Sequence, residues 1–151
     1  MTADPVFHRI LVPTDFSDCA EDAWSLAQRL GGAVGAELLL AHVLVEAPLY
    51  DESPFSMDRA RNVYEGARKW VESSLEGWAS KARSHGLTVR VALRTGAPYQ
   101  EIVALATEER ADLVVMGTHG RGGLERALMG SVTDRVVRLA PCPVLTVRRP
   151  E

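Results

Sequence analysis

One glycine-rich segment has the residue types and the spacing of a phosphate-binding loop. It begins with Gly117 and Gly120, and after nine further residues come Gly130 and Ser131. An apolar run precedes the segment, and a helix-like run follows it. Glycines let backbone N–H groups approach an anion closely, and a helix start presents unpaired donors and the positive end of the helix dipole. The segment therefore predicts a phosphate cradle, with Ser131 as a plausible N-cap of the helix.

A second loop follows the first apolar run of the chain and contains Pro13, Thr14 and Asp15. Asp15 either caps the next helix or accepts hydrogen bonds from ribose hydroxyls or an adenine amine. The backbone around Val43, near the end of the second apolar run, could contact the edge of a base. Together with the phosphate cradle, these residues suit a mononucleotide.

The glycine segment also contains side chains whose roles stay open. We expect His119, a histidine in a loop, to face solvent or phosphate rather than to act as a general base. Arg121 either screens phosphate charge or is merely solvated. The hydroxyls of Ser131 and Thr133 could add donors for phosphate. No catalytic residue is assigned.

Motifs of other nucleotide sites and of hydrolases are absent from the sequence. The only lysines, Lys69 and Lys81, do not follow a glycine, so there is no P-loop, and Glu125 occupies the third glycine position of a dinucleotide fingerprint. A GxSxG nucleophile elbow is also absent. The two cysteines, Cys19 and Cys142, form no CxxC motif, and the sequence predicts no metal site built from side chains.

The composition is that of an ordinary globular domain. The 151 residues carry a formal charge of −3, and 46% of them are apolar. This charge gives no bulk attraction to nucleic acid or to an anionic membrane, and no apolar run approaches the roughly 20 residues that span a bilayer. We expect a single domain over 1–151 in the cytoplasm, with a flexible N-terminus over about residues 1–7.

Strand-like and helix-like runs alternate along the whole chain, which favours an α/β fold with one open, five-stranded parallel sheet and helices on both faces. The alternation of polar and apolar side chains over 88–94 places that strand at an edge of the sheet. The continuous apolar runs place the first, second and fourth strands inside it. The strand order 3-2-1-4-5 satisfies both. The strands are predicted at 8–13, 36–45, 88–94, 112–116 and 144–147; the helices are predicted from Ser17 to Gly31 and Gly32, at 57–85, from Gly96-Ala97-Pro98 onward and at 132–140; and 46–57 is predicted as a loop.

This strand order predicts where a ligand binds. Open α/β sheets bind ligands outside the carboxyl ends of the strands, at the point where the winding direction reverses. Here the reversal lies between the first and fourth strands. The loop that contains Asp15 and the loop that begins at Gly117 should therefore meet in one crevice, although they are far apart in the sequence.

The two loops together resemble the universal stress protein family. The resemblance rests on the spacing Gly117-x2-Gly120-x9-Gly130-Ser131 and on Pro13-Thr14-Asp15-Phe16-Ser17 after the first strand, and it extends from His8 to Arg148. It implies a Rossmann-like, adenine nucleotide alpha hydrolase-like fold and the ATP-binding subgroup of the family. It also implies a Mg or Mn ion held mainly by the phosphates, and a homodimer joined through the last strand, 143–148.

By matching positions, the resemblance implies three sets of contacts. Asp15 and the backbone near Val43 would contact adenine, Met116, Gly117 and Gly120 would line the ribose and phosphates, and Gly130, Ser131 and Val132 would hold the phosphates. The complete set of predicted nucleotide-binding residues is Pro13, Thr14, Asp15, Val43, Met116, Gly117, His119, Gly120, Arg121, Gly130, Ser131, Val132 and Thr133.

Three functions remain open from the sequence, in the following order of preference. The first is a nucleotide-dependent regulatory or stress-response protein, in which ATP shifts a conformational or partner equilibrium. The second is a slow ATPase. Against this hypothesis, the sequence places no lysine, no evident base and no acidic metal pair near the loop. The third is a structural partner module whose crevice binds no nucleotide.

Overall fold

The computed structural model describes residues 3–45, 54–119 and 129–149. The five strands form one parallel sheet in the order β3-β2-β1-β4-β5, which confirms the predicted fold class and strand order. The elements are β1 (Arg9–Pro13), α1 (Asp18–Val34), β2 (Glu37–Leu44), α2 (Pro54–Ser84), β3 (Val89–Thr95), α3 (Pro98–Glu108), β4 (Leu113–Gly117), α4 (Ser131–Leu139) and β5 (Val144–Val147).

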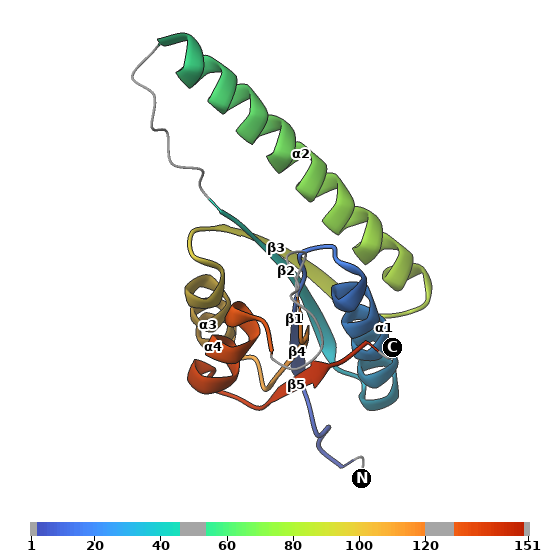
Figure 1. The fold of residues 1–151 in the computed structure, drawn as a ribbon. Coiled ribbons are helices and arrows are strands. Elements are labelled where there is room, and N and C mark those ends of the chain that lie inside the picture. The colour runs from blue at the N-terminus through green and yellow to red at the C-terminus, as the bar shows by residue number, and fades with distance from the viewer. Residues whose placement is uncertain (1–2, 46–53, 120–128, 150–151) are drawn as a thin grey trace.

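Helices cover both faces of the sheet (Figure 1). Helices α1 and α2 pack on one face, and α3 and α4 pack on the other. Side chains alternate between the faces of a strand, so Ile10 and Leu38 enter the core under α1 and α2, while Leu11 and Leu39 enter the core under α3 and α4. The inner strands are thus buried on both faces, which explains their continuous apolar runs.

Helix α1 begins at the predicted place but ends later than predicted. The Ser17 side chain caps it by accepting a hydrogen bond from the Ala20 N–H. Gly31 and Gly32 do not end the helix: it continues to Val34, and Gly35, with φ of 74°, supplies the left-handed C-cap. Gly31 is instead needed for packing, because a Cβ atom at this position would lie 2.8 Å from Leu38 Cδ2.

Helix α2 begins at Pro54, within the segment 46–57 that was predicted to be a loop; residues 46–53 lie outside the described residues. The C-terminal part of α2 packs on β2 and β3, and its first turns extend past the carboxyl ends of these strands (Figure 1). Trp24 and Trp78 pack against the core, whereas Trp70 is 52% exposed. Within the described ranges, no helix combines the length and the apolar character that crossing a membrane requires.

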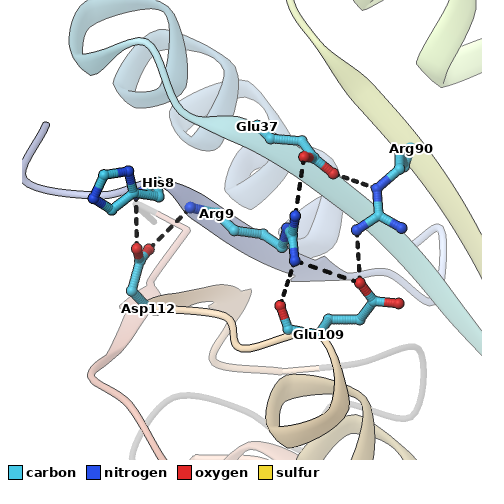
Figure 2. Close-up of polar contacts among 6 residues, drawn as sticks. All are labelled: His8, Arg9, Glu37, Arg90, Glu109 and Asp112. Carbon is cyan, nitrogen blue, oxygen red and sulfur yellow. Dashed lines mark hydrogen bonds and ion pairs between the residues drawn. The ribbon is translucent and has the colours of Figure 1, made fainter.

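A network of ion pairs ties the amino ends of the strands together (Figure 2). The guanidinium of Arg9 contacts the carboxylates of Glu37 and Glu109, and Arg90 contacts the same two carboxylates. Burial by itself would raise the pKa of Glu37, but the hydrogen bonds and charges of Arg90 and Arg9 hold that pKa below its ordinary value. Asp112 adds hydrogen bonds to the N–H groups of His8 and Arg9, at 2.7 and 3.1 Å.

The two glycines inside α1 give a matched test of this packing. Gly32→Ala should raise the free energy of unfolding by up to about 1 kcal/mol, because alanine favours a helix over glycine and its Cβ would meet Leu87 at an ordinary 3.4 Å. Gly31→Ala should lower it by about 1 kcal/mol or more, because overpacking against the buried Leu38 outweighs the same gain in helix propensity. Urea denaturation of both variants measures the difference. Equal stabilisation by both substitutions would show that the contact between α1 and β2 is loose.

Candidate functional site

The two loops predicted to meet are brought together by the pairing of β1 with β4. Ile10 pairs with Leu113 and Leu11 with Val114, so the two strands run side by side and in parallel. Strand β2 lies on the other side of β1, and β5 on the other side of β4. The winding direction therefore reverses between β1 and β4, and the turn after Pro13 and the loop after Gly117 begin at the same edge of the sheet.

The turn after β1 is fixed by hydrogen bonds within it and to β2. The N–H of Thr14 donates to the Ala41 carbonyl at 2.8 Å, and its hydroxyl oxygen accepts the Phe16 N–H at 3.0 Å. The carboxylate of Asp15 accepts the Ser17 N–H at 3.0 Å. Phe16 has a φ of 62°, a left-handed conformation that is uncommon for a bulky residue. Asp15 is thus presented on a turn whose backbone is held at several points.

The start of α4 is fastened directly to the end of β4. The Gly130 N–H donates to the Thr118 carbonyl at 2.7 Å, and the Thr133 hydroxyl donates to the Gly117 carbonyl at 2.8 Å. The predicted N-cap was wrong by one residue: Gly130 is the N-cap and Ser131 is the first helical residue. The cap shifts because the Gly130 carbonyl accepts the first helical hydrogen bond, from the Asp134 N–H at 2.9 Å.

The first turn of α4 has the features of an anion-binding helix start. Its N-cap makes no side-chain hydrogen bond, and the first N–H groups of any helix have no partner within the helix. The hydroxyl of the buried Thr133 donates its proton to the Gly117 carbonyl. Of the donors predicted for this residue, its backbone N–H is the one that could bind phosphate. The exposed Ser131 keeps both its N–H and its hydroxyl at the helix start. The arrangement can bind phosphate mainly through backbone donors.

The structure gives Gly117 a packing role that the sequence did not reveal. A Cβ atom at this position would lie 2.7 Å from Cys19 Sγ and 3.0 Å from the Cys19 carbonyl carbon, so α1 approaches β4 closely here. The Cys19 thiol donates to the Val147 carbonyl at 3.3 Å and lies 3.9 Å from the Thr118 hydroxyl. Gly117 is therefore needed for the fit of α1 against the sheet, whether or not a ligand approaches it.

The remaining predicted residues occupy different depths at this edge. Pro13 and Met116 are buried, and the Met116 side chain lies in the core under α3 and α4, so only its backbone is available to a ligand. Val43 and His119 are half-buried, and His119 Nδ1 lies 2.9 Å from the Thr118 hydroxyl. The other predicted residues of the glycine segment, Gly120 and Arg121, lie outside the described residues.

The sequence did not assign two residues at the turn after β1 to the site: His42 contacts this turn, and Phe16 lies within it. His42, on β2, lies with its Nδ1 atom 2.6 Å from the Thr14 carbonyl oxygen. The ring of Phe16 packs 5.2 Å from the His42 ring and 5.1 and 5.3 Å from the rings of Trp70 and Trp78. The sequence signal for His42 is a histidine inside an otherwise apolar strand. Phe16 carries no sequence signal for its left-handed backbone.

Among the described residues, no group of three or more histidine, cysteine, aspartate or glutamate side chains is arranged to hold a metal ion.

Comparisons with known proteins agree on one family. The universal stress protein family profile matches residues 7–148. Universal stress protein MJ0531 of Methanocaldococcus jannaschii is 34% identical over 150 residues, which cover 97% of this chain and 85% of that protein. The solved structure of MJ0577, from the same organism, superposes with a TM-score of 0.84 and 29% identity over 95% of this chain and 96% of that one. A universal stress protein in complex with cAMP superposes with a TM-score of 0.70 and 25% identity, covering 94% of this chain and 97% of that one.

The close approach at Gly117 predicts a coupled pair of substitutions. Gly117→Ala should lower the free energy of unfolding by about 1–3 kcal/mol, because the added methyl group meets a buried sulfur and the α1 backbone. Cys19→Ala removes the sulfur, so the double variant should lose less stability than the sum of the two single variants. Urea denaturation of the four proteins measures this coupling. Additive losses would show that the Cys19 sulfur does not limit the size of the residue at position 117.

Proposed function

The chain belongs to the universal stress protein family, and we propose that it is a member that binds an adenine nucleotide and acts as a regulatory protein in the cytoplasm. One observation carries the proposal: the turn that presents Asp15 and the start of α4 lie at the same switch point of the sheet, and the start of α4 has no side-chain cap. A carboxylate that can accept hydrogen bonds thus lies at the same edge of the sheet as a set of donors suited to phosphate. The relative solved with cAMP supports an adenine nucleotide as the class of ligand.

The proposed ligand is ATP, with its phosphates at the start of α4. The backbone N–H groups of Ser131, Val132 and Thr133 would bind phosphate oxygens, with the Ser131 hydroxyl as a further donor. The ribose and adenine would extend toward Asp15 and the backbone of Val43. A Mg ion would neutralise phosphate charge and would be held mainly by the phosphates themselves.

Binding of a nucleotide at such a site could shift an equilibrium between two conformations of the protein. The nucleotide would bridge the turn before α1 and the start of α4, two elements that cover opposite faces of the sheet. A ligand shifts an equilibrium between two conformations only by the difference in its affinity for them. ATP that contacts both elements would bind two conformations with different affinities if these elements are separated by different distances in the two conformations. This is the physical basis of the regulatory role.

The first experiment identifies what the protein binds. The purified protein is denatured, any released small molecule is identified by chromatography and mass spectrometry, and the nucleotide-free protein is titrated with Mg-ATP by calorimetry. We expect an adenine nucleotide to be released or bound. Gly130→Val should weaken binding by about a hundredfold, because the side chain blocks the approach to two charge-assisted N–H contacts of about 1.5 kcal/mol each. The backbone should tolerate valine, since Gly130 has a φ of −57°.

A matched control separates a local effect from a general effect of valine. Gly66→Val makes the same chemical change on α2, where a Cβ would meet nothing within 4 Å, and should leave nucleotide affinity unchanged. Unchanged affinity of Gly130→Val would contradict the phosphate assignment. If the unmodified protein instead releases ADP over multiple turnovers, and Gly130→Val abolishes this release, the protein is a slow ATPase. Failure of the unmodified protein to bind any nucleotide would favour a structural partner module.

We also propose that two copies of the chain pair through β5. This strand lies at the edge of the sheet, beside β4, and exposed apolar side chains lie on it and on the neighbouring α4, namely Leu145, Val137 and Leu139. The carbonyls of Pro143 and Val147 accept hydrogen bonds from β4. Because backbone groups alternate in direction along a strand, the N–H groups of Val144 and Thr146 point away from β4, toward a partner strand.

This alternation selects the substitution that tests the dimer. Thr146→Pro removes an outward N–H and should weaken dimerisation by about fivefold or more, through the loss of hydrogen bonds worth about 1 kcal/mol at the paired edge. Thr146→Val keeps the N–H and should leave the dimer intact. Leu145→Pro would instead remove a donor to β4 and disturb the protomer itself. Sedimentation equilibrium measures the association, and identical behaviour of the proline and valine variants at Thr146 would exclude β5 as the interface.

A further inference from the structure

We propose that His42 is a positioning residue of the nucleotide site, which holds the turn 14–17 in the conformation that presents Asp15. The inference rests on the proposed function for its link to nucleotide, whereas the contact between His42 and the turn stands on the structure alone. His42 lies on β2 and Asp15 follows β1, so the side chain reaches across from the neighbouring strand.

The hydrogen bond of His42 fixes which ring nitrogen carries the proton. Nδ1 lies 2.6 Å from the carbonyl oxygen of Thr14. A carbonyl oxygen can only accept a hydrogen bond, so Nδ1 must be the donor and must carry a proton. The imidazole therefore donates to the Thr14 carbonyl, while the Thr14 N–H donates to the Ala41 carbonyl, so β2 holds this residue at both of its backbone polar groups.

The same ring also supports the strained residue of the turn. The Phe16 backbone is left-handed, a conformation that a bulky side chain adopts only when its surroundings enforce it. Its ring lies 5.2 Å from the His42 ring at a tilt of 34°, and its N–H donates to the Thr14 hydroxyl. His42 thus contacts the residue before Asp15 by a hydrogen bond and the residue after it by ring packing.

These contacts leave Asp15 between two fixed neighbours. Thr14 is held through its N–H, its carbonyl and its hydroxyl, and Phe16 through its ring and its N–H. The Asp15 carboxylate in turn accepts the Ser17 N–H, at the residue that caps α1. Loss of the His42 hydrogen bond would free the Thr14 carbonyl and allow the peptide unit between Thr14 and Asp15 to rotate. The orientation of the Asp15 carboxylate would then no longer be set before the ligand arrives.

Two variants separate the hydrogen bond from the packing of the ring. His42→Phe keeps a ring beside Phe16 and removes the donor, and it should weaken binding of Mg-ATP by about tenfold, the value of one hydrogen bond. His42→Asn supplies a side-chain N–H at a similar reach and should keep the affinity within about threefold of the unmodified protein, as partial rescue of one hydrogen bond would require. The two variants are compared at equal fractions of folded protein, measured by urea denaturation.

A double-mutant cycle with Asp15→Ala distinguishes positioning from a merely structural role. If His42 acts through Asp15, Asp15→Ala should reduce affinity much less in the His42→Phe background than in the unmodified protein. If His42 only packs the core, His42→Phe should lower stability, and Asp15→Ala should cost the same affinity in both backgrounds. Additive losses, or equal affinities of His42→Phe and the unmodified protein, would overturn the inference.

A readout without ligand separates this inference from the proposed function. Hydrogen exchange of the Phe16 and Ser17 N–H groups, both bonded within the turn, should be faster in His42→Phe than in the unmodified protein and restored in His42→Asn. Unchanged exchange in His42→Phe would show that His42 does not hold the turn. If the exchange responds as expected but the unmodified protein binds no nucleotide, the proposed function fails and the hold of His42 on the turn is retained.

Discussion

The pairing of β1 with β4 is the contact on which the arrangement of the candidate site depends. The strands come from opposite ends of the chain and pair through Ile10 with Leu113 and Leu11 with Val114. Their connections then leave toward opposite faces of the sheet, to α1 on one face and α4 on the other. Backbone at the switch point is consequently not covered by a crossover helix. The turn that contains Asp15 and the start of α4 lie at the same edge of the sheet because of this pairing, together with the hydrogen bonds that fasten α4 to the end of β4.

The two ends of the sheet differ in how their charges and polar groups are satisfied. At the amino ends, Arg9 and Arg90 face Glu37 and Glu109, so each charge in this network meets an opposite charge within the protein (Figure 2). At the carboxyl ends, side chains and backbone fasten the loops, but the first turn of α4 receives no side-chain cap. The start of α4 therefore leaves backbone donors at the carboxyl ends of the strands, where a ligand can supply acceptors.

The sequence was sufficient for the strand order because each step used a strong pattern. Continuous apolar runs identified the inner strands, and the alternation over 88–94 identified β3 as an edge. Local glycine patterns were less reliable. Gly31 and Gly32 looked like a helix end, but Gly31 fits against Leu38, a residue whose position depends on how β2 packs on α1. The packing role of Gly117 was hidden for the same reason, since it depends on Cys19 from a distant part of the chain.

Within the site, backbone positions were easier to predict than side-chain partners. The spacing of Gly130 and Ser131 located the helix start to within one residue, because helix starts have local rules. The contacts of His42 and Phe16 obey no local rule: they join β2, the turn after β1 and α2, and each residue by itself looks like part of an ordinary core. Contacts of this kind follow from the strand order, so they become visible only once the sheet is assembled.

The left-handed Phe16 has a consequence for how a nucleotide could act on this protein. Such a backbone costs about 1–2 kcal/mol for a residue other than glycine, and each aromatic ring contact returns about 0.5–1.5 kcal/mol. Together, the contacts with His42, Trp70 and Trp78 are large enough to offset this strain, so they help to hold the turn in its observed conformation. Under the proposed function, a nucleotide on Asp15 would bind beside this cluster of rings, and any shift of the turn would reach the tryptophans of α2 because they pack on the Phe16 ring.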